Sequence, residues 1–264
     1  MKIANILDRV YQDFIMPSRL EEYRKILLEI SENDFEQISI RDFLMLDMGK
    51  KISGKFCVHR HDIDTDLKTA KKMFQIEKDL GVRSTFYFRL KTLDKDFMQQ
   101  IQAYGSEVGY HYEEIASYAK EAKLSNREHI HSALPEIQEQ FLKNLSYIRN
   151  YSQCAIETVS SHGDFVNRKI EMPNYKILEG LNLWDQFELK LEAYNPDFND
   201  YFEFRVRDKQ GTKKWTHPFK LSSFSDTSNI LILTHPRHWN KNILVNLEDN
   251  LMRIYEGVKW KLGI

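Results

Sequence analysis

Apolar positions follow two different periods along the chain, and the change between them predicts where helices and strands lie. Over residues 1–50 apolar side chains recur at helical spacing, and the segment from Ser18 to Glu21 reads as a capping box in front of one helix. From residue 51 onward, short apolar runs alternate with amphipathic stretches. We therefore expect a helical N-terminal extension over 1–50 and one larger α/β domain over 51–264.

Short apolar or β-branched runs that end in polar residues predict the strands of the larger domain. These runs are 56–58, 84–88, 107–110, 155–159 and 230–233, with further short strands within 183–207. The helices expected between and after them are 66–80, 94–104, 113–150 with a break near Pro135, 173–179 and an amphipathic helix at 243–261. This alternation predicts a largely parallel sheet, as in a (β/α) barrel.

Polar residues that can bind a metal fall where four of the predicted strands end. Asp62 and Asp64 follow the first strand, and His111, His162 and His235 each follow a later one. In a (β/α) barrel the carboxyl ends of the strands gather on one face, and that face carries the chemistry. Agreement at four strand ends favours a functional site.

Each of these motifs also has a structural explanation. Asp62 and Asp64 could divide the work, one binding a divalent metal and the other taking a proton from water, or they could cap the following helix. A neutral His111 is a good zinc ligand, although a lone histidine is more often structural. The segment around His162 is equally well explained as a tight Gly-Asp turn.

The residues after the fourth strand are the ones most typical of the entrance to a substrate-binding site. His235 follows a buried strand, with Arg237 and Trp239 close behind it. The histidine could protonate a leaving group, the arginine could hold an anion, and the tryptophan could stack on a sugar face. The alternative is a loop with an aromatic plug. A similar segment, 215–218, follows no predicted strand and is interpreted as structural.

The charge and hydrophobicity of the chain exclude some classes of function. The chain has 38 Lys and Arg against 39 Asp and Glu, a formal net charge of −1, which excludes a broad attraction to nucleic acid or anionic membranes but not a local basic patch. The longest aliphatic run, 230–233, is far too short for an integral membrane span. With no export signal and two cysteines, Cys57 and Cys154, we expect a cytoplasmic protein without disulfides.

Four motifs in order resemble the polysaccharide deacetylase family (carbohydrate esterase family 4), in a divergent branch found with surface-polysaccharide genes. The motifs are His61-Asp62-Ile63-Asp64, the strand segment 81–88, Glu107-Val-Gly109-Tyr-His111 and Leu233-Thr-His235. The resemblance spans roughly 55–240. It implies a distorted (β/α) barrel and metal-assisted hydrolysis of an N-acetyl group on an amino sugar.

The resemblance also implies a role for each motif residue. Asp62 would be the general base, Asp64 and His111 would bind a divalent metal, with zinc as the first choice, and His235 would be the general acid. The implied substrate is a nucleotide-linked or lipid-linked amino sugar used in O-antigen or capsule synthesis. No nucleic-acid partner is implied, and the oligomeric state is not indicated.

The sequence departs from the family at one ligand position. The second motif of the family has another histidine four residues after the first, and here that position is Ile115. Candidates for the third ligand are His162 first, then Glu113, then His61. The Arg-containing third motif of the family is also not evident around 160. Ile115 favours a rival interpretation, a non-catalytic sugar-binding or scaffold protein that has lost metal chemistry.

A third interpretation assigns the same histidines to a different barrel metallohydrolase, such as a phosphoesterase. It would use His59, His61, His162 and His235. The two enzymatic interpretations differ at His59, because only the phosphoesterase needs this residue to bind metal.

Overall fold

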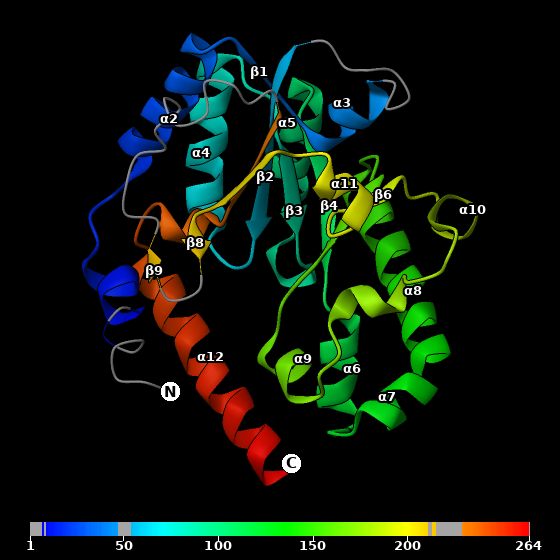
Figure 1. Ribbon diagram of the computed structural model, residues 1–264. Coiled ribbons are helices and arrows are strands. Elements are labelled where there is room, and N and C mark those ends of the chain that lie inside the picture. The colour runs from blue at the N-terminus through cyan, green and yellow to red at the C-terminus, as the bar shows by residue number, and fades with distance from the viewer. Residues whose placement is uncertain (1–6, 8, 47–53, 211–212, 215–228, 264) are drawn as a thin grey trace.

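A curled sheet of parallel strands forms the centre of the protein (Figure 1). The computed structural model describes residues 7, 9–46, 54–210, 213–214 and 229–263. The strands of the sheet are β1 (Phe35–Ile38), β2 (Lys55–Ile63), β3 (Thr85–Phe88), β4 (Glu107–Tyr112), β5 (Thr158–Ser161), β6 (Leu191–Glu192), β7 (Phe204–Arg207) and β10 (Asn229–Thr234). Their order is β6-β5-β4-β3-β2-β10-β7, with β1 paired to β2, and every pairing is parallel.

Helices connect the strands and cover the sheet (Figure 1). They are η1 (Tyr11–Ile15), α2 (Leu20–Glu32), α3 (Ile40–Met45), α4 (Leu67–Leu80), η2 (Leu90–Thr92), α5 (Lys95–Tyr104), α6 (Glu114–Glu121), α7 (Arg127–Ser132), α8 (Leu134–Ser152), α9 (Phe165–Lys169), η3 (Asn174–Ile177), α10 (Leu183–Phe187), α11 (Pro196–Asp200), η5 (Pro236–His238) and α12 (Ile243–Leu262). A short antiparallel pair, β8 (Lys209–Gln210) and β9 (Lys213–Lys214), lies outside the main sheet. The mixed α/β class and the parallel, half-barrel sheet confirm the predicted architecture at this level.

The first 50 residues are not helical throughout. The helical prediction holds for α2 and α3 but is wrong at Phe35–Ile38, which is strand β1 and pairs with the first half of β2. The predicted capping box at Ser18 is also wrong. Arg19 is the N-cap of α2, so Glu21 stands at the second helical position and not at the third, from which a side chain could reach back. The domain boundary at residue 50 stays a prediction.

Two segments between β5 and β7 differ from the sequence interpretation. The helix expected at 173–179 is the short 3₁₀ turn η3, and the region 183–207 contains α10 and α11 besides its strands. The break expected near Pro135 is real, because α7 ends at Ser132 and Pro135 occupies the first turn of α8.

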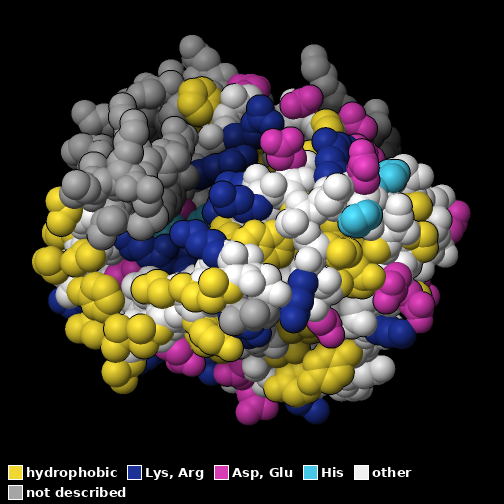
Figure 2. Space-filling view, turned by 90° about the horizontal axis from the view of Figure 1, so that it is seen from below, with side chains coloured by type: hydrophobic (Ala, Val, Ile, Leu, Met, Phe, Trp, Pro, Cys, Tyr) yellow, Lys and Arg dark blue, Asp and Glu magenta, His cyan; other side chains and the backbone are white. Residues whose placement is uncertain are grey.

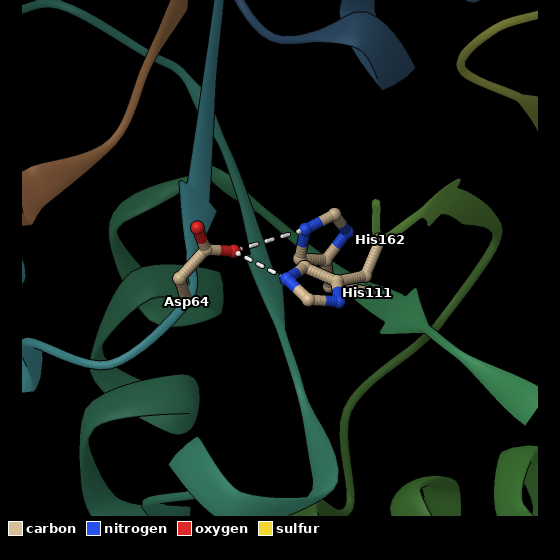
Figure 3. A group of neighbouring side chains, drawn as sticks. All are labelled: Asp64, His111 and His162. Carbon is tan, nitrogen blue, oxygen red and sulfur yellow. Dashed lines mark ion pairs between the residues drawn. The ribbon is translucent and has the colours of Figure 1, made fainter. Parts of the chain in front are cut away.

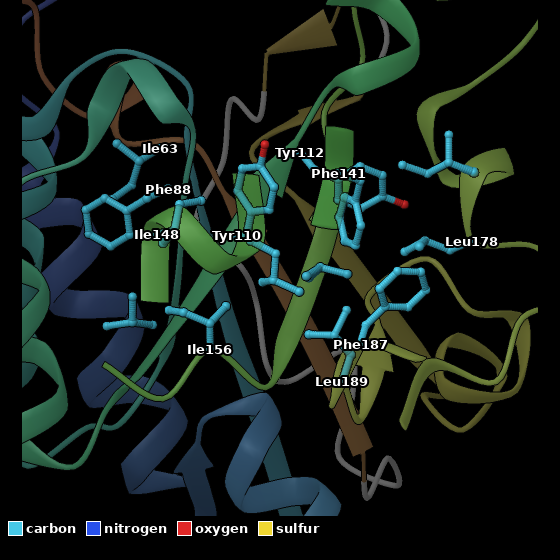
Figure 4. Close-up of a cluster of buried hydrophobic side chains, with 14 of the residues drawn as sticks. Ile63, Phe88, Tyr110, Tyr112, Phe141, Ile148, Ile156, Leu178, Phe187 and Leu189 are labelled. Atoms are coloured by element: carbon cyan, nitrogen blue, oxygen red, sulfur yellow. The ribbon is translucent and has the colours of Figure 1, made fainter. Parts of the chain in front are cut away.

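Apolar side chains pack on both faces of the sheet. The larger cluster lies between the strands β3 to β5 and the helices outside them, where Tyr110, Tyr112 and Phe141 meet (Figure 4). On the inner face, Phe56 and Val58 of β2 pack with side chains of α3 and α11. Alternate residues of a strand point to opposite faces, so Arg60 and Asp62 follow Phe56 and Val58 inward.

The apolar side chains of the last helix face outward, away from the body of the protein. The predicted helix is present as α12, but its apolar side chains are 46–65% exposed at Leu247, Leu251, Ile254, Tyr255 and Val258. The polar residues Asn246 and Asp249 face the body and are buried. None of the helices in the described part of the chain has the length and hydropathy needed to cross a membrane.

Candidate metal centre

The register of the strands brings the polar strand ends together. His61 on β2 lies opposite Thr234 on β10, and His111 on β4 lies opposite Ser160 on β5. All strands of the sheet run the same way, so their carboxyl ends share one edge. Asp64, His162 and His235, each just beyond a strand, are therefore carried to the same edge as His111.

Three side chains at this edge point toward one another: Asp64, His111 and His162 (Figure 3). Asp64 Oδ1 lies 3.3 Å from His111 Nε2 and 3.5 Å from His162 Nε2. The two rings are nearly perpendicular, at 85°, with centroids 5.1 Å apart. One oxygen and two nitrogens are ligand types that catalytic zinc sites in proteins use, and such sites keep a further position open.

Each imidazole directs one nitrogen at Asp64, and neighbouring groups lie close to the other nitrogen. His111 Nδ1 donates to the Ser160 carbonyl at 2.9 Å, so Nε2 is the ring nitrogen that faces the Asp64 carboxylate. The backbone N–H of His162 donates to the Tyr112 carbonyl at 2.7 Å, and its Nδ1 lies 3.2 Å from Glu113 Oε2. Groups of this kind orient metal-binding histidines in proteins.

Asp64 Oδ1 is buried and has no hydrogen-bond partner among the described residues. Burial alone would raise the pKa of this carboxyl, but His162 and His111 outweigh it and hold the pKa well below its usual range. Burial also lowers the pKa of His162, more than Asp64 and Glu113 raise it. An ionised, unsatisfied carboxylate beside a neutral imidazole fits a divalent cation.

Two other groups in the described chain have metal-binding residue types, but their carboxylates are already satisfied. Asp208 accepts from the side chain of His235 at 2.9 Å, from its backbone at 2.6 Å and from Trp239 Nε1 at 3.2 Å. In the group of Glu113, His162 and Asp164, Glu113 is paired with Arg89 and Asp164 with Lys120. Asp64 is the carboxylate that lacks such partners.

Asp62 is buried beside the group and is held by Arg60. The guanidinium donates to both carboxylate oxygens, at 2.9 and 2.8 Å, and also to Ser160 Oγ at 2.6 Å. Burial would raise the pKa of Asp62, but Arg60 and His111 outweigh it and lower the pKa. The Asp62 carboxylate is therefore ionised and fixed in orientation, 3.7 Å from His111 Nε2.

His235 is held by Asp208 in a similar way. Its Nδ1 donates to Asp208 Oδ1 at 2.9 Å. Burial lowers the pKa of His235, but Asp208 outweighs it, and Asp64 and Asp62 add to the effect, so the pKa rises to about 9. His235 thus carries a proton at neutral pH and can donate it to a leaving group.

The other predicted site residues lie elsewhere. Ile115 is fully buried in the apolar core at the start of α6, and His162, directly after β5, is the third member of the group. His59 and His61 point to the opposite face of β2, where His59 bonds Gln37 at 2.8 Å and His61 bonds Glu77 at 2.6 Å. The histidine set of the phosphoesterase interpretation is therefore divided between two faces of the sheet.

Arg237 and Trp239 are not brought to the group. Arg237 bridges Asp249 at 2.7 Å and Asp13 at 3.0 Å, and so fastens α12 and η1 to the body. Trp239 is fully buried, with its ring 5.2 Å from that of Tyr23. These contacts give no support to their predicted role in substrate binding. Segment 215–218 lies outside the described residues.

Sequence reasoning missed Arg60 and Asp208. Both had a detectable signal: Arg60 is two residues before Asp62, hence on the same face of β2, and Asp208 directly follows β7. The strand end at 208 was hidden because β7 is short and its exposed, charged pattern does not read as a buried strand.

No protein-family model and no curated protein matches this chain. Among solved structures, the chain is similar to the peptidoglycan deacetylase PdaC from Bacillus subtilis. That likeness has 12% sequence identity and a TM-score of 0.32, and it covers 79% of this chain and 98% of the other. At so low a TM-score, the ground for proposing a function is the site itself.

Proposed function

We propose that the protein is a metal-dependent hydrolase that removes an N-acetyl or similar acyl group from an amino sugar. The metal in this proposal is a divalent cation, Zn²⁺ first, held by Asp64, His111 and His162. A surface-polysaccharide pathway and the polysaccharide deacetylase type of barrel are further parts of the proposal, and they derive from the motif resemblance. A cytoplasmic setting, expected from the sequence itself, is also part of the proposal.

The observation that carries the proposal is the unsatisfied Asp64 oxygen between two imidazole nitrogens. A buried carboxylate without a partner is costly, and a bound cation would remove that cost. The neighbouring carboxylates have their own cations: Arg60 pairs with Asp62, and Arg89 pairs with Glu113. The remaining negative charge at this edge is thus concentrated on Asp64.

The surrounding residues suit hydrolysis of an amide. When bound, the cation would polarise the amide carbonyl and lower the pKa of a water beside it. Asp62, kept ionised and oriented by Arg60, accepts the proton of the attacking water. His235, kept protonated by Asp208, donates a proton to the departing amine. The products are a free acid and an amino sugar.

The test is metal content measured by elemental analysis, followed by amine release from N-acetylated amino sugars. We expect close to one metal ion per chain in the wild type and at least a tenfold lower occupancy in Asp64→Ala and His111→Ala. The matched control is His129→Ala, because His129 is an exposed histidine on α7 away from the group.

The outcomes separate the interpretations. If Asp64→Ala loses both the bound metal and the release of amine, the hydrolase proposal is supported. A folded wild type that takes up no divalent metal would overturn it and favour the sugar-binding alternative. Metal loss in His59→Ala, with retention in Asp64→Ala, would instead favour the phosphoesterase.

A further inference from the structure

A groove of about 540 Å³ lies between α6 and α12, beside the metal-binding group. Its lining includes five cationic side chains, Arg89, Lys91, Lys120, Lys123 and Lys259. Figure 2 shows the molecule from below, the end on which α6 and α12 lie, with several Lys and Arg side chains exposed there. The groove is thus a local basic site on a chain whose net charge is only −1.

Two residues of the groove lining, Glu113 and Arg89, also contact the metal-binding group. Glu113 lines the groove and lies 3.2 Å from His162 Nδ1. Arg89 also lines it and donates to the Asp64 carbonyl at 3.4 Å. A ligand in the groove would therefore lie next to the metal-binding group, on the side of Glu113 and Arg89.

Some of the positive charge in the groove is neutralised within the protein. Arg89 is paired with Glu113, and Lys120 lies 2.9 Å from both Asp164 and Glu256. These pairs hold the wall of the groove together. They leave Lys91, Lys123 and Lys259 as the cations that can attract a ligand.

Only weak contacts offset these three lysines. Lys91 lies 3.8 Å from Asp249, a carboxylate that also pairs with Arg237 at 2.7 Å and Arg253 at 2.9 Å. Lys259 lies over the ring of Tyr255, and Lys123 has no ion pair among the described residues. Glu121 is the one further carboxylate in the lining. The excess of ammonium groups makes the groove attractive to an anion.

We propose that this groove binds the diphosphate of a diphosphate-linked amino sugar, with the sugar's acylated nitrogen placed at the metal-binding group. The inference rests on the proposed function and names its substrate class. Lysine ammonium groups bind phosphate oxygens as point charges. The diphosphate could belong to a nucleotide or to a lipid carrier, since Met252 and Tyr255 on the α12 wall would accept either an aromatic base or a hydrocarbon chain.

One variant removes charge from the groove without weakening the fold. Lys123 follows α6 in the left-handed conformation, with φ 55°, and Leu124 N–H donates to the Ala119 carbonyl at 2.9 Å around it. Glycine is favoured at this position of a helix end. Lys123→Gly should therefore leave the melting temperature unchanged or raise it, while it removes a phosphate contact.

The experiment measures binding of inorganic pyrophosphate and of UDP-N-acetylglucosamine by calorimetry, with equal metal content verified in every protein. We expect Lys91→Ala and Lys123→Gly each to weaken binding about tenfold and to reduce its salt dependence. The matched control, Lys143→Ala on α8, removes an exposed lysine paired with Glu139 and should bind as the wild type does.

Two further comparisons identify the source of the diphosphate and distinguish a failure of the groove assignment from a failure of the proposed hydrolysis. A polyprenyl-diphosphate sugar that binds more tightly than UDP-N-acetylglucosamine assigns the lipid carrier, and the reverse order assigns the nucleotide. Pyrophosphate binding that is unchanged in both lysine variants overturns the groove assignment, even if a neutral N-acetylated oligosaccharide is deacetylated. If the lysine variants lose pyrophosphate binding but no amine is ever released, the groove assignment stands and the proposed hydrolysis fails.

Discussion

The protein should lose stability in mild acid because it buries a neutral histidine. His59 is 1% exposed, and its Nε2 donates to Gln37 Oε1 at 2.8 Å. The Gln37 amide is fixed with its oxygen toward His59, because its Nε2 donates to the Leu27 carbonyl and to Ser31 Oγ. His59 Nδ1 has no partner among the described residues, so a second proton there would be buried without an acceptor.

The magnitude follows from the pKa. Burial, with a smaller contribution from His61, lowers the pKa of His59 from 6.5 to about 4, despite the opposing effect of Glu77. Between pH 6.5 and about 4, His59 is therefore protonated in the unfolded chain but remains neutral in the folded protein. Over this window the free energy of unfolding should fall as the pH falls, by about 3 kcal/mol in total for this residue, and the contribution should level off below the folded pKa.

The assay is urea denaturation at pH values from 8 to 4, with wild type and His59→Gln compared at each pH. Glutamine keeps a donor toward Gln37 and does not titrate, so the wild type should lose about 3 kcal/mol relative to the variant across the window. His129→Gln on the exposed face of α7 is the control and should follow the wild type. Parallel profiles for wild type and His59→Gln would refute the reasoning.

Two further predictions concern packing and proton transfer. Gly109→Ala would put a Cβ 2.3 Å from the Tyr87 ring, and we expect it to lower the free energy of unfolding by about 1–3 kcal/mol in urea. Gly257→Ala, inside α12 with nothing near its Cβ, should raise it by about 0.5–1 kcal/mol, and equal effects of the two would contradict the packing argument. Asp208→Asn removes the charge that raises the pKa of His235 to about 9, so NMR should find a lower pKa, and the alkaline limb of amine release should move to lower pH. An unchanged His235 titration would show that Asp208 does not set its charge.

The ends of the central strands were predictable because they depend on local pattern alone. A short apolar run marks each central strand, and the polar residue after it marks the edge of the sheet, so Asp64, His111 and His162 could be assigned to one edge before any contact was known. The N-terminal strand β1 was not predictable in the same way. It has four residues, and its place in the sheet depends on pairing with β2, which is a tertiary effect.

The interpretation of the loop after β10 rested on proximity along the chain, and the contacts in the structure do not support it. Arg237 and Trp239 are within four residues of His235, but Arg237 pairs with Asp13 and Asp249, and the buried Trp239 donates to Asp208 and packs on Tyr23. Arg237 is used to neutralise Asp249 and Asp13, which are far from it in sequence. The direction of a side chain in an irregular loop depends on such distant partners, and sequence spacing does not encode them.

The alternation of residues along β2 separates the residues that the two metallohydrolase interpretations use. A shift of strand pairing by one residue would exchange the two faces and carry His59 to the inner side. That shift is prevented at the other end of the strand, where Phe56 and Val58 fill the apolar interior with α3 and α11. The same register that buries these two side chains turns Asp62 toward the site. Apolar packing at the amino end of β2 thus determines which polar residues reach the site at its carboxyl end.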